Sequence, residues 1–173
     1  MNKFFLGLIL LVLVVGFSVY AYLGGFNNPE IKVTTSKTQY IAGTYYAGPI
    51  EGEELGLVFR KAAEVLEKKE LAGQLANIYY NSPEKQTDSL KAFIGILIQD
   101  TTAQLPAGYQ LQKLPGGKKV VQATINAHYM LSPKKLYPAL FEYLKKESLK
   151  NRQTYLEIFP NERSAFIQTE ILP

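Results

Sequence analysis

Asn77-Ile78-Tyr79-Tyr80-Asn81 is a short β-prone segment with a counterpart later in the chain, Glu157-Ile158-Phe159-Pro160-Asn161. Both segments run into turn-forming residues, and a second β-prone run follows each of them. The elements that precede the two segments also come in the same order, which indicates an internal duplication. The duplication decides the fold, because each copy supplies one half of a common core.

Each copy is predicted to consist of a strand, a helix and two strands, from the alternation and helical spacing of apolar residues. The first copy comprises strand 39–47, helix 51–70 and strands 76–80 and 90–98; the second comprises strand 118–126, a helix capped by Ser132 and Pro133, and strands 154–159 and 165–172. Further strands precede the copies, at 31–35 and 109–114. The sequence therefore predicts an α+β fold of duplicated β-α-β-β units with pseudo-twofold symmetry. We expect an antiparallel sheet with both helices on one face and a groove where the halves meet.

The chain begins with an apolar leader, since no charged residue occurs from Phe4 to Phe26. This run is long enough to cross a bilayer as a helix. We predict that residues 1–26 form a single-pass transmembrane anchor, because the run continues past Val19-Tyr20-Ala21, where a signal peptidase would cut. A cleaved signal peptide is the alternative, and it would make the remainder secreted or periplasmic. Lysines lie on both sides of the run and leave the orientation open.

Beyond the leader, residues 27–30 are predicted to form a linker and residues 31–173 a single domain. The 173 residues include no cysteine and one histidine, which excludes thiolate and multi-histidine metal sites, so we expect neither a metal nor a cofactor. The net charge is +4, from 19 Lys and Arg against 15 Asp and Glu. Such a weak, scattered positive charge argues against a nucleic-acid partner.

Glu157 is the candidate binding residue. Strand alternation places Tyr155, Glu157 and Phe159 on one face, so a carboxylate lies between two aromatic rings. A carboxylate removed from water needs a hydrogen-bond partner, a raised pKa or a bound cation. Aromatic rings attract lipophilic cations, and this combination therefore favours a small-molecule ligand of that kind.

The groove is expected to contain four further residues: Tyr46, Tyr79, Phe93 and Asn77. Asn77 occupies the position in the first copy that Glu157 occupies in the second. A purely structural role for Glu157 is the alternative, either in a hydrogen bond with a tyrosine hydroxyl or in an ion pair with Arg60 or Arg152.

Three motifs in this order resemble the GyrI-like small-molecule-binding domain, which is also the effector-binding module of AraC-type and MerR-type regulators. They are Leu105-Pro106-Ala107-Gly108-Tyr109, Leu114-Pro115-Gly116-Gly117-Lys118 and Tyr155-Leu156-Glu157-Ile158-Phe159. The resemblance spans residues 31–172. It implies an aromatic cleft with a glutamate at its base, and Glu157 occupies the matching position. No helix-turn-helix segment is present, so a DNA-binding regulator is not expected.

The leading functional prediction is a membrane-tethered domain, anchored by residues 4–26, that binds lipophilic molecules, cations among them, without catalysing a reaction. The first alternative is a hydrolase of reactive small molecules with Glu157 as general base. The second is a protein-interaction module or membrane receptor that uses the same fold, with its protein partner unspecified.

Overall fold

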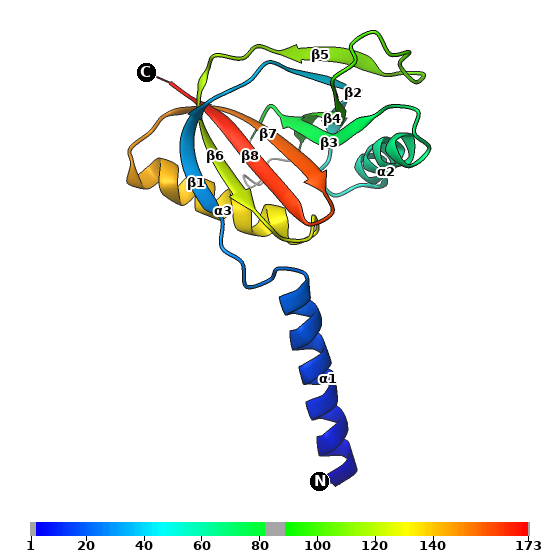
Figure 1. Cartoon of the computed structure of the whole chain (residues 1–173), viewed down its shortest axis with the longest axis vertical. Helices are drawn as coiled ribbons and strands as arrows, with labels where there is room; N and C mark the ends of the chain where they lie inside the picture. The colour runs from blue at the N-terminus through cyan, green and yellow to red at the C-terminus, as the bar shows by residue number, and fades with distance from the viewer. Residues whose placement is uncertain (1–2, 82–88, 173) are drawn as a thin grey trace.

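The structure, a computed structural model, describes residues 3–81 and 89–172 as three helices and eight strands (Figure 1). The elements are α1 Lys3–Tyr22, β1 Glu30–Thr35, β2 Gln39–Gly48, α2 Glu53–Glu67, β3 Gly73–Tyr79, β4 Leu90–Ile98, β5 Gln110–Leu114, β6 Lys119–Ile125, α3 Ser132–Lys146, β7 Asn151–Asn161 and β8 Ser164–Ile171. The predicted α+β class and both β-α-β-β copies are confirmed.

All eight strands form one antiparallel sheet in the order β1-β6-β8-β7-β3-β4-β2-β5. The two halves of this order mirror each other, with β3 and β7 paired in the middle. The pseudo-twofold axis therefore passes between these two strands. It relates Asn77 to Glu157, which are register partners.

The strand that precedes each copy pairs with the other copy. β1 lies beside β6 of the second copy, and β5 lies beside β2 of the first. Each edge strand is therefore exchanged between the halves. The β1–β2 and β5–β6 connections, which make this exchange, are hydrogen-bonded to each other. Ser36 accepts from the Gly117 amide at 2.8 Å and donates its own amide to the Lys118 carbonyl at 2.7 Å.

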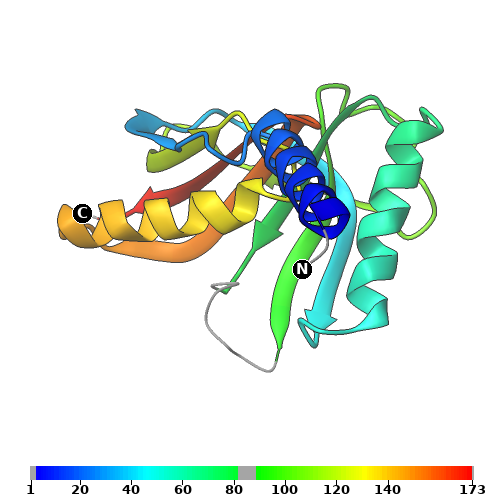
Figure 2. The same cartoon turned by 90° about the horizontal axis from the view of Figure 1, so that it is seen from below.

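Both helices cover the same face of the sheet, as predicted. α2 packs on β2, β3 and β4, whereas α3 packs on β1, β6 and β8. Figure 2 shows α3 and α2 on either side of the middle strands. Their apolar faces meet one core, in which Ala62 of α2 and Leu136 and Leu140 of α3 are fully buried. This burial, rather than helix propensity, stabilises both helices.

The opposite face of the sheet carries a second apolar cluster, formed by Ile41, Ala76, Ile78, Phe93, Leu156 and Ile158. No helix covers this face in the part of the chain described. Instead, the sheet curves toward itself: Gln168 of β8 donates to Gln39 of β2 at 3.2 Å, although three strands separate these two in the sheet. Curvature therefore buries the second cluster.

The start of α3 differs from the predicted cap. Ser132 is the first helical residue and Leu131 is the N-cap, without a side-chain cap hydrogen bond. The Ser132 hydroxyl instead donates back to the Ala127 carbonyl at 2.9 Å. Pro133 lies in the first turn, where its missing N–H costs nothing.

α1 extends away from the domain (Figure 1), and its apolar surface is exposed. Phe4–Tyr22 is long and apolar enough to span a membrane, with 0% of its span buried against the rest of the chain. An N-terminal signal sequence meets the same criterion. Directly after α1, Gly24 lies against Asn126 and Ala127, and both Gly24 and Gly25 are buried.

Truncation of the helical core is expected to destabilise the domain. Leu140→Ala removes a fully buried side chain and should lower the free energy of unfolding by about 2–5 kcal/mol. Leu57→Ala, at a helix position that is 51% exposed, should change it by less than about 0.5 kcal/mol. Urea unfolding of the full chain in detergent, followed by circular dichroism, measures both. Equal losses in the two variants would contradict the assigned core.

Candidate functional site

The centre of the sheet places the predicted acid beside polar and aromatic groups. Across the β3–β7 pair, Asn77 is opposite Glu157, Tyr79 is opposite Tyr155, and Leu75 is opposite Phe159. All six residues lie on the face that carries the helices, because residues two apart in a strand share a face. The predicted arrangement of Tyr155, Glu157 and Phe159 is therefore present.

Glu157 is 2% exposed and has two hydrogen-bond donors. The Asn77 side-chain amide donates to Oε2 at 3.1 Å, and the Tyr79 hydroxyl donates to the same oxygen at 3.2 Å. The other oxygen, Oε1, is buried and accepts no hydrogen bond from the residues that the structure describes. Half of the carboxyl group is thus buried without a partner.

No basic side chain forms an ion pair with Glu157 within the described ranges. Arg152 contacts Glu170 instead, with its Nε 3.1 Å from Oε2. The tyrosine hydrogen bond predicted as a structural role is present, whereas neither Arg60 nor Arg152, both in the described part of the chain, forms an ion pair with Glu157. Glu157 is therefore held by neutral donors, and its charge is uncompensated.

Burial raises the pKa of Glu157 from 4.5 to about 7, and the hydrogen bonds from Asn77 and Tyr79 lower it by a smaller amount. Near neutral pH the charged and neutral forms of the carboxyl group are therefore both populated. Burial, together with the charge of Glu157, raises the pKa of the Tyr79 hydroxyl well above 10. Tyr79 consequently stays protonated and serves as a permanent donor.

Aromatic side chains of α3 pack against β7 next to Glu157. Tyr155 packs edge-on against Tyr137 and Phe141, with ring centroids 6.0 and 5.6 Å apart. The Tyr155 hydroxyl accepts from Asn151 at 3.2 Å. The sequence places Tyr137 and Phe141 on the apolar face of the helix, and their spacing of four residues is the only sign that both reach the same strand.

The other candidates fall on different faces. Tyr46 lies on the helix side in the same core cluster as Tyr79 and Tyr155, and its hydroxyl donates to the Pro49 carbonyl at 2.7 Å. Phe93 lies on the opposite face, in the cluster with Ile78 and Ile158, so its expected place beside Glu157 is wrong. Its register partners, Tyr45 and Ile78, share that opposite face.

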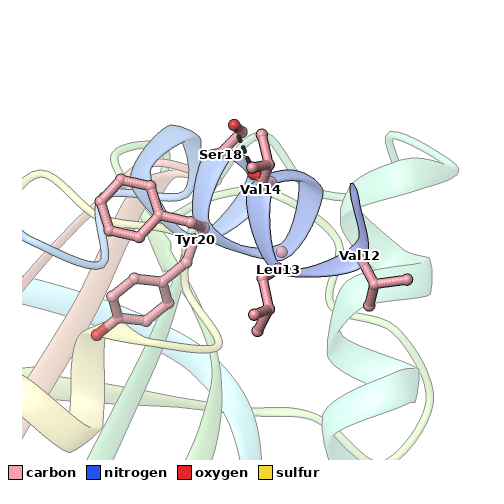
Figure 3. A pocket seen from close by; sticks show the side chains of 7 residues that line it. Val12, Leu13, Val14, Ser18 and Tyr20 are labelled. Atoms are coloured by element: carbon pink, nitrogen blue, oxygen red, sulfur yellow. Dashed lines mark hydrogen bonds between the residues drawn. The ribbon is translucent and has the colours of Figure 1, made fainter. Parts of the chain in front are cut away.

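Two hollows in the surface lie away from Glu157. Figure 3 shows a shallow one along α1, lined by Val12, Leu13, Val14, Gly16, Phe17, Ser18 and Tyr20. All of its lining comes from a single helix, so it belongs to the outer surface of α1. A second hollow lies where the chain enters β1, between residues 27–30 and 124–126. Within the described residues, no group of three His, Asp or Glu side chains could hold a metal ion.

No family model and no curated protein matches this sequence. Solved structures do match. An integron cassette protein from Vibrio cholerae superposes with a TM-score of 0.66 at 12% identity, over 84% of this chain and 99% of that one. The C-terminal domain of EcmrR gives 0.55 at 13% identity, over 84% and 98%. SAV2435, solved with bound tetraphenylphosphonium, gives 0.57 at 10% identity, over 83% and 94%.

These similarities cover 83–84% of this chain, at sequence identities that establish the fold alone. The chain has the fold of the GyrI-like small-molecule-binding domains, joined to an apolar N-terminal helix long enough to span a membrane.

Proposed function

We propose that this protein is a membrane-tethered small-molecule-binding domain that takes a lipophilic cation beside Glu157. One observation carries the proposal: a buried carboxylate whose hydrogen-bond partners are neutral and whose Oε1 is unpaired. A bound cation supplies the missing charge. A carboxylate buried without such compensation is costly, and a cation that contacts Oε1 offsets part of that cost.

The surrounding rings favour a flat or lipophilic cation over a hydrated one. Tyr79 and Tyr155 flank the acid in the sheet, and Tyr137 and Phe141 lie next to Tyr155. Each ring that faces a cation adds about 0.5–2 kcal/mol. The tetraphenylphosphonium bound by SAV2435, which has the same fold, is a cation of this class.

Access to Glu157 requires movement. Only 2% of the residue is exposed, so side chains that cover it must shift before a ligand can contact Oε1. We expect α1 to serve as a single-pass membrane anchor, which would keep the domain at a surface where lipophilic molecules are concentrated.

Hydrolysis is the second candidate function. A carboxyl group with a pKa of about 7 is well matched to general base catalysis at neutral pH, and its unpaired Oε1 could accept a proton from water. The Tyr79 hydroxyl would then hold Oε2 in place through its hydrogen bond. This candidate predicts turnover of an ester or other electrophile that is lost in Glu157→Gln.

Binding of tetraphenylphosphonium tests the leading proposal. Titration calorimetry of the full chain in detergent should give saturable binding, and Glu157→Gln should weaken it at least about tenfold, because the charge interaction is lost. Glu142→Gln is the matched control, since this glutamate is exposed on α3, the helix that contributes Tyr137 and Phe141. Equal affinity in wild type and Glu157→Gln would overturn the electrostatic part of the proposal.

The pH dependence of binding follows from the same residue. A cation binds the charged carboxylate, whose pKa is about 7 in the free protein. Affinity for tetraphenylphosphonium should therefore be constant above about pH 7.5 and fall by about tenfold per pH unit below about pH 6.5. A pH series of the same titration measures this. Affinity that stays level throughout would show that the ligand does not contact Glu157.

The free energy of unfolding should fall as the pH rises, whereas the affinity for the cation should increase. The folded-state pKa is raised, so the folded form holds a proton that the unfolded form releases between about pH 4.5 and 7. The free energy of unfolding of the wild type should fall by about 3 kcal/mol over this range and then level off. Glu157→Gln should lack this fall, as measured by urea unfolding at a series of pH values. A parallel fall in both proteins would exclude Glu157 as its source.

A further inference from the structure

The domain meets the end of α1 through hydrogen bonds from a neighbouring loop. The Leu23 carbonyl, one residue beyond α1, accepts from the His128 amide at 2.9 Å. The Asn27 carbonyl accepts from Lys135 Nζ at 2.9 Å, and the Asn27 side chain donates to the Asn126 carbonyl. The 126–132 loop and the start of α3 are therefore attached directly to the end of the apolar helix.

Gly24 allows the chain at the end of α1 to pass close to Asn126. Its φ of +77° is a conformation that favours glycine, and a Cβ atom there would lie 2.6 Å from the Asn126 carbonyl oxygen. Gly24 and Gly25 are both buried. The junction leaves no flexible spacer between α1 and the domain, so the membrane position of Tyr22 also sets the position of the loop.

Large side chains on this loop face solvent. Met130 is 67% exposed and Tyr129 is 48% exposed, and the Tyr129 ring packs on His128 with centroids 4.3 Å apart. The Tyr129 amide donates to the Glu162 carbonyl at 3.0 Å, which joins the loop to the β7–β8 turn. Two adjacent apolar residues thus lie exposed next to the end of a helix fit to span a membrane.

Basic residues lie on the elements next to this loop. The Arg163 guanidinium lies 3.9 Å from the centroid of the Tyr22 ring, on the last residue of α1. Lys134 is exposed in the first turn of α3, and Lys135 follows it. The acidic neighbours are Glu162 in the β7–β8 turn and Glu30, which lines a hollow with Asn27 and Asn126, so Lys134, Lys135 and Arg163 outnumber them. Aromatic residues beside arginine and lysine are typical of the bilayer–water boundary.

We propose that this surface, formed by Tyr129, Met130, Lys134 and Arg163, is a second membrane contact that lies in the interfacial region of the bilayer from which α1 emerges. Tyr129 and Met130 enter the boundary between head groups and acyl chains, while Lys134 and Arg163 contact lipid phosphates. Two attachments fix the orientation of the domain relative to the membrane plane. The inference rests on α1 being a membrane anchor, as in the proposed function.

Depth-dependent fluorescence quenching tests this contact, because the chain contains no tryptophan. Met130→Trp introduces a single probe at an exposed site, and Leu111→Trp introduces one on β5, a 39% exposed position at the far end of the domain from α1 (Figure 1). Both full-length variants are reconstituted into vesicles that contain phosphatidylcholine brominated near the ester end of its acyl chains. Flotation of the same vesicles reports anchoring independently of fluorescence.

We expect Met130→Trp emission to shift to shorter wavelength and to be quenched at least about twofold more than that of Leu111→Trp, since interfacial tryptophan lies within reach of these bromines. Equal, weak quenching in variants that float with the vesicles would overturn the second contact while leaving the anchor intact. Protein that fails to float would overturn the anchor itself, and the surface proposal with it. Tetraphenylphosphonium binding in detergent is unaffected by either result.

Discussion

The antiparallel pairing of β3 with β7 is the constraint on which the rest of the structure depends. It joins the two copies in the middle of one sheet and puts Asn77 opposite Glu157. Because the helices of both copies cover the same face, this register pair lies at the centre of the molecule and out of water. A slip of one residue would turn Glu157 to the curved face, among the apolar side chains Ile78, Leu156 and Ile158, and away from its donors Asn77 and Tyr79.

Burial of Glu157 has two opposed effects. Desolvation raises its pKa to about 7 and makes the charged form unfavourable in the free protein. The same desolvation strengthens any interaction with a cation that reaches Oε1, because no water competes. In the proposed function, the stability lost by burying the acid is offset when a cation binds beside it. The neutral donors, Asn77 and Tyr79, moderate the cost without supplying a competing charge.

The sequence predicts the elements, and it also predicts which face of the sheet each side chain of β7 takes, because the polar Glu157 marks one face of an alternating strand. It cannot do the same for β4, because both faces of this strand are apolar over the run Ala92-Phe93-Ile94-Gly95-Ile96-Leu97-Ile98. The expected face of Phe93 is wrong for this reason. The exchange of β1 and β5 between copies was equally hidden, since alternation says nothing about which neighbour a strand selects. The packed junction at Gly24 depends on contacts with Asn126, a residue distant in sequence.

The near-symmetry of the sheet has an evolutionary consequence at the Asn77–Glu157 pair. In a dimer of two identical single units joined through the same strand, each residue on the axis would face its own copy. Two glutamates there would repel each other in a buried setting, and two asparagines would carry no charge. Fusion of the units into one polypeptide frees the two positions to diverge. The chain can thus hold one acid against its own amide donor, an asymmetric arrangement that a symmetric ancestor of identical subunits could not have encoded.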